Sequence, residues 1–307
     1  MITSDALSSD ERHSVGRLLE AATAHDGVPA LDEAARLALS GTGARHLRIP
    51  AAPGSGEATA QGYASILPDG TVQGMVHPEA RRQGHGTALL QAVLAERPDA
   101  GVWAHGALEP ALAFLEGRGL RATRRLLTLS RDLGPSAPLP AVPAARIDGL
   151  QLDTFVAERD AEAWVELNAQ AFAEHPEQGA LTREDLDRRI AEPWFDPEDL
   201  LLARQGGELL GFVWIKREPA DAGGEQSGTA GCSGVAELYV VGTAPRAQGR
   251  GVAGHLIGTA LHRLSADGTA RVELYVEADN TAALELYRRW GFTVAGRDVQ
   301  MRLPEAG

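Results

Sequence analysis

Two glycine-bearing segments have the residue types and spacing to bind a pyrophosphate. The first reads R-R-Q-G-H-G over Arg81–Gly86, and the second reads Q-G-R-G-V-A over Gln248–Ala253. Each follows a strand-like run and precedes an amphipathic run typical of a helix. Glycines let the backbone approach a ligand closely, and the N–H groups of a helix's first turn attract an anion. For either copy alone, a strand-to-helix turn without a ligand is the alternative.

The surroundings of the two segments also repeat. A helix is expected after each, over Thr87–Glu96 and His255–Leu264, followed by a strand, a second helix and an ending at Gly119 or Gly291. The repeat predicts a duplicated α/β domain. A single alignment at constant spacing sets Pro78 on Pro245, Arg81 on Gln248, Gly84 on Gly251 and Gly86 on Ala253.

A proline-rich segment lies between the two copies. Gly134–Pro143 contains four prolines in ten residues, a composition that excludes a helix or a central strand and favours a stiff linker. We therefore predict an N-terminal domain over 1–133, a linker over 134–148 and a C-terminal domain over 149–307. Inside the second domain, Pro219–Gly234 is rich in Gly, Ala and Ser. It predicts a long loop between the strand-like runs Leu209–Ile215 and Val235–Val241.

Composition narrows the class of partner. The chain has 307 residues, of which 44% are hydrophobic and 23% charged, and a formal net charge of −13. Such a charge argues against nucleic acid and anionic membranes. One cysteine, Cys232, rules out an internal disulfide and suits a reducing compartment. No apolar run is long enough to span a membrane. We expect a cytoplasmic monomer without a metal.

The second copy ends in a recognisable pattern, N-x-x-A-x-x-x-Y-x-x-x-G-F, carried by Asn280, Ala283, Tyr287, Gly291 and Phe292. Together with the strand, glycine turn and helix before it, this pattern resembles the GNAT superfamily of acetyltransferases. The resemblance implies two tandem GNAT domains in an α/β fold, each with a mixed sheet flanked by helices. It also implies acetyl-CoA as cosubstrate and direct acetyl transfer to an amine.

Two further segments are similar to those of tandem members that acetylate the cysteinyl amine of cysteinyl-glucosaminyl-inositol. They read A-F-A-E-H-P-E-Q-G over Ala171–Gly179 and A-E-L-Y-V-V-G over Ala236–Gly242. The resemblance spans nearly the whole chain and is stronger in the second half. Two alternatives stay open. One is a GNAT enzyme for another amine, such as an aminoglycoside, a polyamine or a protein N-terminus; the other is a non-catalytic acetyl-CoA sensor.

The resemblance assigns the acetyl-CoA contacts to strand ends, glycine turns and one helix start. The first copy is expected to bind acetyl-CoA without catalysing transfer. Its contacts are Met75, Val76, His77, Arg81, Arg82, Gln83, Gly84, His85 and Gly86. In the second copy they are Val241, Gly242, Thr243, Gln248, Gly249, Arg250, Gly251, Val252, Ala253, Gly254, Asn280, Thr281, Ala282, Ala283, Leu284 and Glu285.

Acetyl transfer needs a proton acceptor for the amine, whose pKa is about 8, and a proton donor for the leaving thiolate. We predict Glu237 as acceptor, because it lies on the strand before the second turn, and Tyr287 as donor. The alternative for Glu237 is a solvent-facing residue of the strand. The alternative for Tyr287 is a residue that packs its helix against the sheet. At constant spacing Glu237 aligns with Gly70, and the Gly119–Gly291 match aligns Tyr287 with Leu115 and Asn280 with Leu108. The first copy therefore lacks both groups, and we predict one catalytic site.

Substrate contacts follow from the resemblance alone. They are Glu33, Glu177, Lys216, Glu237 and Tyr275, whose charged groups suit sugar hydroxyls and an amide carbonyl. An ordinary surface role is the alternative for each; Lys216 stands apart as the one lysine of the chain. Direct transfer gives Cys232 no covalent role. His85 and His105 lack metal-ligand spacing. We expect Trp164, Trp194 and Trp290 in the core or a pocket wall.

Overall fold

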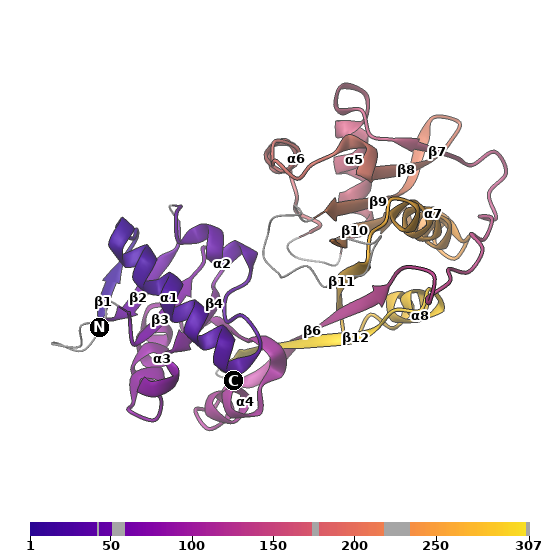
Figure 1. Ribbon diagram of the computed structural model, residues 1–307. Coiled ribbons are helices and arrows are strands. Elements are labelled where there is room, and N and C mark those ends of the chain that lie inside the picture. The colour runs from indigo at the N-terminus through magenta and orange to yellow at the C-terminus, as the bar shows by residue number, and fades with distance from the viewer. Residues whose placement is uncertain (42, 51–58, 174–177, 218–233, 305–307) are drawn as a thin grey trace. The chain divides into compact units, whose positions relative to one another are not determined.

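The structure is a computed structural model that describes residues 1–41, 43–50, 59–173, 178–217 and 234–304 (Figure 1). Its chain divides into two compact units. Unit 1 comprises Met1–Leu127, Glu277–Asp279 and Gly296–Gly307, and unit 2 comprises Thr128–Val276 and Asn280–Ala295. Within the described ranges, no helix is long and apolar enough to cross a membrane.

Unit 1 is built on a mixed sheet with strand order β1-β2-β3-β4-β5-β12. The pair β4·β5 is parallel and its neighbours are antiparallel. The strands are β1 (Ile2–Ser4), β2 (Arg45–Ile49), β3 (Gly62–Ile66), β4 (Thr71–Val76), β5 (Gly101–Ala104) and β12 (Thr293–Arg302). The helices are α1 (Ser9–Asp26), α2 (Glu33–Ala38), α3 (His85–Glu96) and α4 (Glu109–Glu116), with short 3₁₀ turns at Pro78–Ala80 and His105–Ala107.

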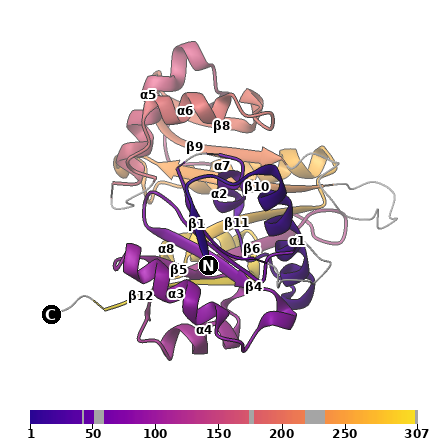
Figure 2. The same ribbon diagram turned by 90° about the vertical axis from the view of Figure 1, so that its left-hand side faces the viewer.

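Helices cover both faces of this sheet (Figure 2). Successive residues of a strand point to opposite faces, so Tyr63 packs under α1 while Ala64 packs under α3. A capping box between Ser8 and Glu11 begins α1, and Gly27, with a φ of 77°, ends it. The sheet therefore has two separate apolar cores, one under each helical layer.

Unit 2 repeats this plan with strand order β6-β11-β10-β9-β8-β7. The pair β10·β11 is parallel, while β7·β8, β8·β9 and β9·β10 are antiparallel. The strands are β6 (Arg121–Asp132), β7 (Gln151–Thr154), β8 (Leu200–Gln205), β9 (Glu208–Arg217), β10 (Val235–Thr243) and β11 (Arg271–Glu277). The helices are α5 (Ala157–Ala171), α6 (Arg183–Ile190), α7 (Val252–Ala266) and α8 (Thr281–Arg289), with 3₁₀ turns at Pro197–Asp199 and Pro245–Ala247.

The predicted elements agree with these bounds. The expected helices Thr87–Glu96 and His255–Leu264 are α3 and α7, and the expected strands Leu209–Ile215 and Val235–Val241 are β9 and β10. The α/β class is confirmed, with mixed strand pairing flanked by helices in each unit, and the strands of both units belong to one 12-stranded sheet. The loop predicted over Pro219–Gly234 lies, except for its last residue, outside the described residues.

The compact units do not follow a single cut of the chain. Two strands change unit along their length: β6 passes to unit 2 at Thr128, and β12 passes to unit 1 at Gly296. Unit 1 therefore contains the C-terminal end of the chain, and its β5 pairs with β12 through Val102 and Met301. The boundary predicted at residue 134 does not include this exchange of β6 and β12 between the units. Pairing between distant strands leaves no signal in the local sequence.

The proline-rich segment belongs to unit 2 and packs against α7. Pro140 and Pro143 offer their carbonyl oxygens to His262 and His255 of α7, each at 2.9 Å. Further along, the Arg146 N–H donates to the Arg250 carbonyl at 2.7 Å. Because proline lacks an N–H group but keeps its carbonyl, the segment contributes acceptors to side chains of the helix. Hydrogen bonds therefore hold this segment along α7, from His262 to the second glycine turn.

Candidate active site

The two glycine turns have the same backbone conformation. Arg81 and Gln248 are extended, with φ, ψ of −66°, 159° and −61°, 149°. The next position is left-handed in both copies, with a φ of 63° at Arg82 and 70° at Gly249. Gly84 and Gly251 follow with φ of 88° and 86°. Three matching positions establish that the predicted sequence repeat is also a structural repeat.

The helices after these turns begin without a side-chain cap. Gly84 and Gly251 are the N-cap residues of α3 and α7, and neither turn supplies a side-chain acceptor. Of the other helices, α4 and α5 also lack a side-chain cap, whereas α1, α2, α6 and α8 are capped by Ser8, Asp32, Thr182 and Asn280. The first N–H groups of α3 and α7 therefore remain available at the positive end of each helix dipole. This is the arrangement that fits a pyrophosphate.

The predicted donor contacts of unit 2 lie along the end of β10, the turn and the starts of two helices. Val241–Thr243 end β10, Gln248–Gly251 form the exposed turn, and Val252–Gly254 begin α7. Asn280 caps α8 by accepting the Ala283 N–H at 3.1 Å, and Thr281–Glu285 follow it. The Val252 and Leu284 side chains are buried in the core, so these two could contact a ligand only through backbone.

The turn of unit 1 is held by an ion pair that sequence reasoning missed. Met75–His77 end or follow β4, and Gln83 and His85 flank the turn glycine. The Arg81 guanidinium makes a bidentate pair with Asp26 at 2.8 and 2.7 Å and donates to the Val76 carbonyl. Hydrogen bonds from Arg81 lower the pKa of the Asp26 carboxyl. The Arg81 side chain thus fixes the turn against α1, which leaves backbone groups to meet a ligand.

Parallel strands separate beside each turn. In unit 2 the pairing of β10 with β11 ends at Glu237 opposite Glu273, although β10 continues to Thr243 and β11 to Glu277. In unit 1 the pairing of β4 with β5 covers only two residue pairs. Backbone groups beyond the last pair lack a strand partner on that side, so an extended ligand with amide groups could pair with them.

Only the second copy has a bulge in this strand. Between Leu238 and Val240 the register of β10 against β9 shifts by one residue, which makes Tyr239 the extra residue. In unit 1, β4 pairs with β3 in unbroken register from Val76 to Val72. The bulge corrects one prediction from constant spacing. Thr71 pairs with Gly101 as Glu237 pairs with Glu273, so the counterpart of Glu237 is Thr71 and not Gly70.

Glu237 and Lys216 are direct cross-strand partners in the β10·β9 pair. Directly opposite residues have Cβ atoms about 5 Å apart, so this register brings two of the predicted site residues together. The Lys216 ammonium lies 5.1 Å from the Trp194 ring centre and 5.8 Å from that of Tyr239. Trp194 and Tyr239 belong to an aromatic cluster with Trp214. A carboxylate, a cation and aromatic rings thus gather where β10 and β11 separate.

Tyr287 lies on the buried face of α8, 8% exposed. Its ring meets Phe292 edge-on, with ring centres 5.7 Å apart. Burial raises the pKa of the phenol to about 12, so it is protonated at neutral pH. Leu115 occupies the corresponding position of α4 and is part of the apolar core of unit 1. Neither Thr71 nor Leu115 is a carboxylate or a phenol.

The remaining predicted residues fall in several places. Tyr275 is on β11, 53% exposed. Glu33 begins α2 of unit 1. Glu177 and Cys232 lie outside the described residues. Trp164 and Trp290 are buried, as expected, and Trp194 is half-buried. His105, which sequence reasoning set aside, has its Nδ1 3.4 Å from Asp298 of β12, a contact that only the strand exchange creates.

Comparison with known proteins agrees with this geometry. The model of the acetyltransferase (GNAT) family matches residues 161–292. The chain also resembles the solved structure of a GCN5-related N-acetyltransferase from Sphaerobacter thermophilus, with a TM-score of 0.70, 27% identity, and coverage of 98% of this chain and 94% of that one. A tandem GNAT protein from the clavulanic acid biosynthesis pathway shares the fold at a TM-score of 0.63 and 20% identity, over 98% of each chain.

Full-length relatives narrow the class. The mycothiol acetyltransferase of Brachybacterium faecium is 54% identical over 100% of both chains. That of Thermomonospora curvata is 42% identical over 99% of this chain and 97% of its own. The chain therefore belongs to the GNAT family of acetyltransferases, in the group of the mycothiol acetyltransferases, and it is an acetyltransferase.

Proposed function

We propose that the protein transfers acetyl from acetyl-CoA to the cysteinyl amine of cysteinyl-glucosaminyl-inositol, giving mycothiol. The name of its full-length relatives, mycothiol acetyltransferase, supports this choice of acetyl acceptor. The observation that carries the chemistry is the Glu237–Lys216 pair beside the separation of β10 from β11, next to an uncapped glycine turn. Acetyl-CoA would be held by the backbone of that turn and of the end of β10.

In this proposal the neutral amine attacks the thioester carbonyl carbon, and the carbon–sulfur bond breaks. Glu237 accepts the proton that the amine loses, directly or through water. The Tyr287 phenol donates a hydrogen bond and then its proton to the departing CoA sulfur, so that the products are an amide and CoA thiol. With its pKa raised to about 12, Tyr287 is a weak acid, and its proton moves only as charge develops on sulfur.

We propose no acetyl transfer for the first copy. Its turn has the conformation and the free helix N-terminus that a pyrophosphate needs, while Thr71 and Leu115 stand where unit 2 has Glu237 and Tyr287. It would bind acetyl-CoA only. Glu33, Glu177, Lys216 and Tyr275 remain proposed contacts of the acceptor, and their carboxylate, ammonium and phenol groups suit sugar hydroxyls and an amide.

The test is incubation of the protein with acetyl-CoA and a panel of amines. The panel contains cysteinyl-glucosaminyl-inositol, glucosaminyl-inositol without the cysteine, cysteinamide, a polyamine and an aminoglycoside. Product mass and a thiol assay after CoA removal are read together, because N-acetylation leaves the product thiol free whereas S-acetylation blocks it. We expect one added acetyl group with a free thiol on the first compound only. Faster acetylation of the polyamine or aminoglycoside would overturn the substrate assignment.

A further inference from the structure

Unit 2 has a polar cavity lined by residues from the end of β6, the start of β11 and the segment that follows α8. Its volume is about 510 Å³. The lining includes Arg131 and Arg271, the hydroxyl residues Ser130 and Thr293, and Gly291. None of these residues has a part in the acetyl transfer described above.

Arg131 is a buried cation, only 8% exposed. Its Nη2 donates to the carbonyls of Ala137 at 3.4 Å and Pro138 at 2.9 Å, and its buried Nε has no hydrogen-bond partner. Across the described ranges, no carboxylate forms an ion pair with it. Burial lowers the pKa of this guanidinium. Carbonyls supply only partial negative charge, both here and at the nearby end of α8, so most of the positive charge is unbalanced.

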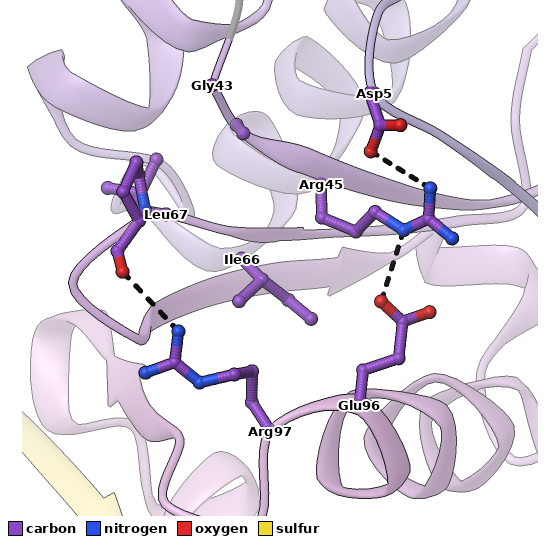
Figure 3. Close-up of a pocket in the computed structure, with 9 residues that line it drawn as sticks. Asp5, Gly43, Arg45, Ile66, Leu67, Glu96 and Arg97 are labelled. Atoms are coloured by element: carbon purple, nitrogen blue, oxygen red, sulfur yellow. Dashed lines mark hydrogen bonds and ion pairs between the residues drawn. The ribbon is translucent and has the colours of Figure 1, made fainter.

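Two less buried arginines of unit 1 differ from Arg131 in having carboxylate partners. Unit 1 has a depression beside Arg45 and Arg97 (Figure 3). Arg45 contacts Asp5 at 2.9 Å and Glu96 at 3.1 Å, and Arg97 contacts Asp99 at 3.0 Å. Both arginines are therefore balanced by carboxylates.

Within the cavity of unit 2, the acidic residue Asp132 is already engaged. Its carboxylate accepts from Arg271 Nε at 2.7 Å. The opposite charges of Asp132 and Arg271 cancel each other, so the positive charge of Arg131 has no counter-charge in the cavity. The cavity is thus locally positive in a chain whose formal net charge is −13.

The fold itself does not require a cation at this position. Gly291 follows Trp290, the C-cap of α8, and an added Cβ at Gly291 would collide with the Arg131 guanidinium. Gly119 is its counterpart in unit 1, where an added Cβ would instead meet the Leu303 side chain at 3.8 Å. A leucine occupies in one copy the space that an arginine occupies in the other. Packing alone therefore does not explain why an arginine is buried at position 131.

We propose that this cavity is a binding site for a small oxyanion, a phosphate or carboxylate group. The Arg131 guanidinium is its main charge partner, and Arg271, Ser130 and Thr293 form its wall. A guanidinium offers paired N–H donors that match the oxygens of either group, and an anion would balance the buried charge.

The experiment measures the binding of inorganic phosphate to the full chain at constant ionic strength. Saturating CoA is present throughout, so that the glycine turns do not contribute phosphate binding. We expect saturable binding with a Kd of about 1 mM and a shift of the Arg131 Nε–H resonance. A parallel titration with acetate tests the carboxylate source. Arg131→Leu, which copies the residue found in unit 1, should weaken phosphate binding at least about ten-fold.

Arg289→Gln is the matched control. It removes one positive charge from an exposed arginine of α8, 77% exposed, that does not line the cavity. It should bind phosphate like the wild type. Equal loss in both variants, phosphate binding that survives Arg131→Leu, or no saturable binding by the wild type would each overturn the proposal. If Arg131→Leu fails to fold, the Arg131 resonance of the wild type decides, since a guanidinium that merely holds the carbonyls of Ala137 and Pro138 gives no phosphate-dependent shift.

Discussion

Glu237 and Glu273 form the last residue pair before the parallel strands β10 and β11 separate. The two carboxylates share a strand register, yet only Glu237 also has Lys216 opposite it on β9. The proposed mechanism assigns proton transfer to Glu237 alone. Glu273 therefore provides a control that differs by one strand.

Glu237→Gln should lower kcat about 100-fold at pH 7 and recover in part toward pH 9. The reason is that a growing fraction of the amine, with a pKa near 8, is then already neutral. Steady-state rates between pH 6 and 9.5 measure this. Glu273→Gln should keep the wild-type profile. A defect of equal size at every pH would assign Glu237 to substrate positioning.

Tyr287→Phe should lower kcat at least about ten-fold and leave the affinity for acetyl-CoA unchanged, because the phenol acts in the transition state. Since burial raises the Tyr287 pKa to about 12, the ratio of wild-type to variant kcat should stay constant from pH 6 to 9. Tyr63→Phe removes another buried phenol, in unit 1, and should spare kcat. An unaltered kcat in Tyr287→Phe would make this residue a packing residue.

Asp26→Asn should destabilise unit 1 by about 1 kcal/mol at pH 7 through loss of the pair with Arg81. The folded-state pKa of Asp26 is lowered from 3.8, so the stabilisation is complete above that value and disappears as the pH falls below it. Carboxyl NMR titration and chemical denaturation at several pH values measure both effects. Glu20→Gln, an exposed change on the same helix, should have neither. A normal Asp26 titration would refute the pair.

Local sequence was sufficient for the elements and for the turns. The glycine spacing identified both strand-to-helix turns, and the structure gives Gly84 and Gly251 nearly equal φ. The bulge at Tyr239 was not predictable in this way, because one extra residue changes pairing between strands without a local signal. The alignment of Glu237 with Gly70 therefore missed Thr71 by one position.

Contacts between segments that are distant in the sequence were also not predicted. Arg81 has a partner in Asp26, and His105 has one in Asp298, which reaches it only through the exchange of β12. The sequence alone predicts Arg131 to be an ordinary basic residue of a strand. Its burial without a carboxylate depends on how β6 packs beside Gly291, which no residue spacing reveals.

The central claim is that the chain has two acetyl-CoA turns and one catalytic site. Equilibrium binding and turnover of Gly84→Asp and Gly251→Asp test it most directly. Both positions are helix N-caps with positive φ, so aspartate strains the two turns to a similar degree, and its charge opposes a pyrophosphate. We expect two bound equivalents of acetyl-CoA in the wild type, one in each variant, and loss of turnover with Gly251→Asp alone. A wild type that binds one equivalent, or loss of turnover with Gly84→Asp alone, would contradict this claim.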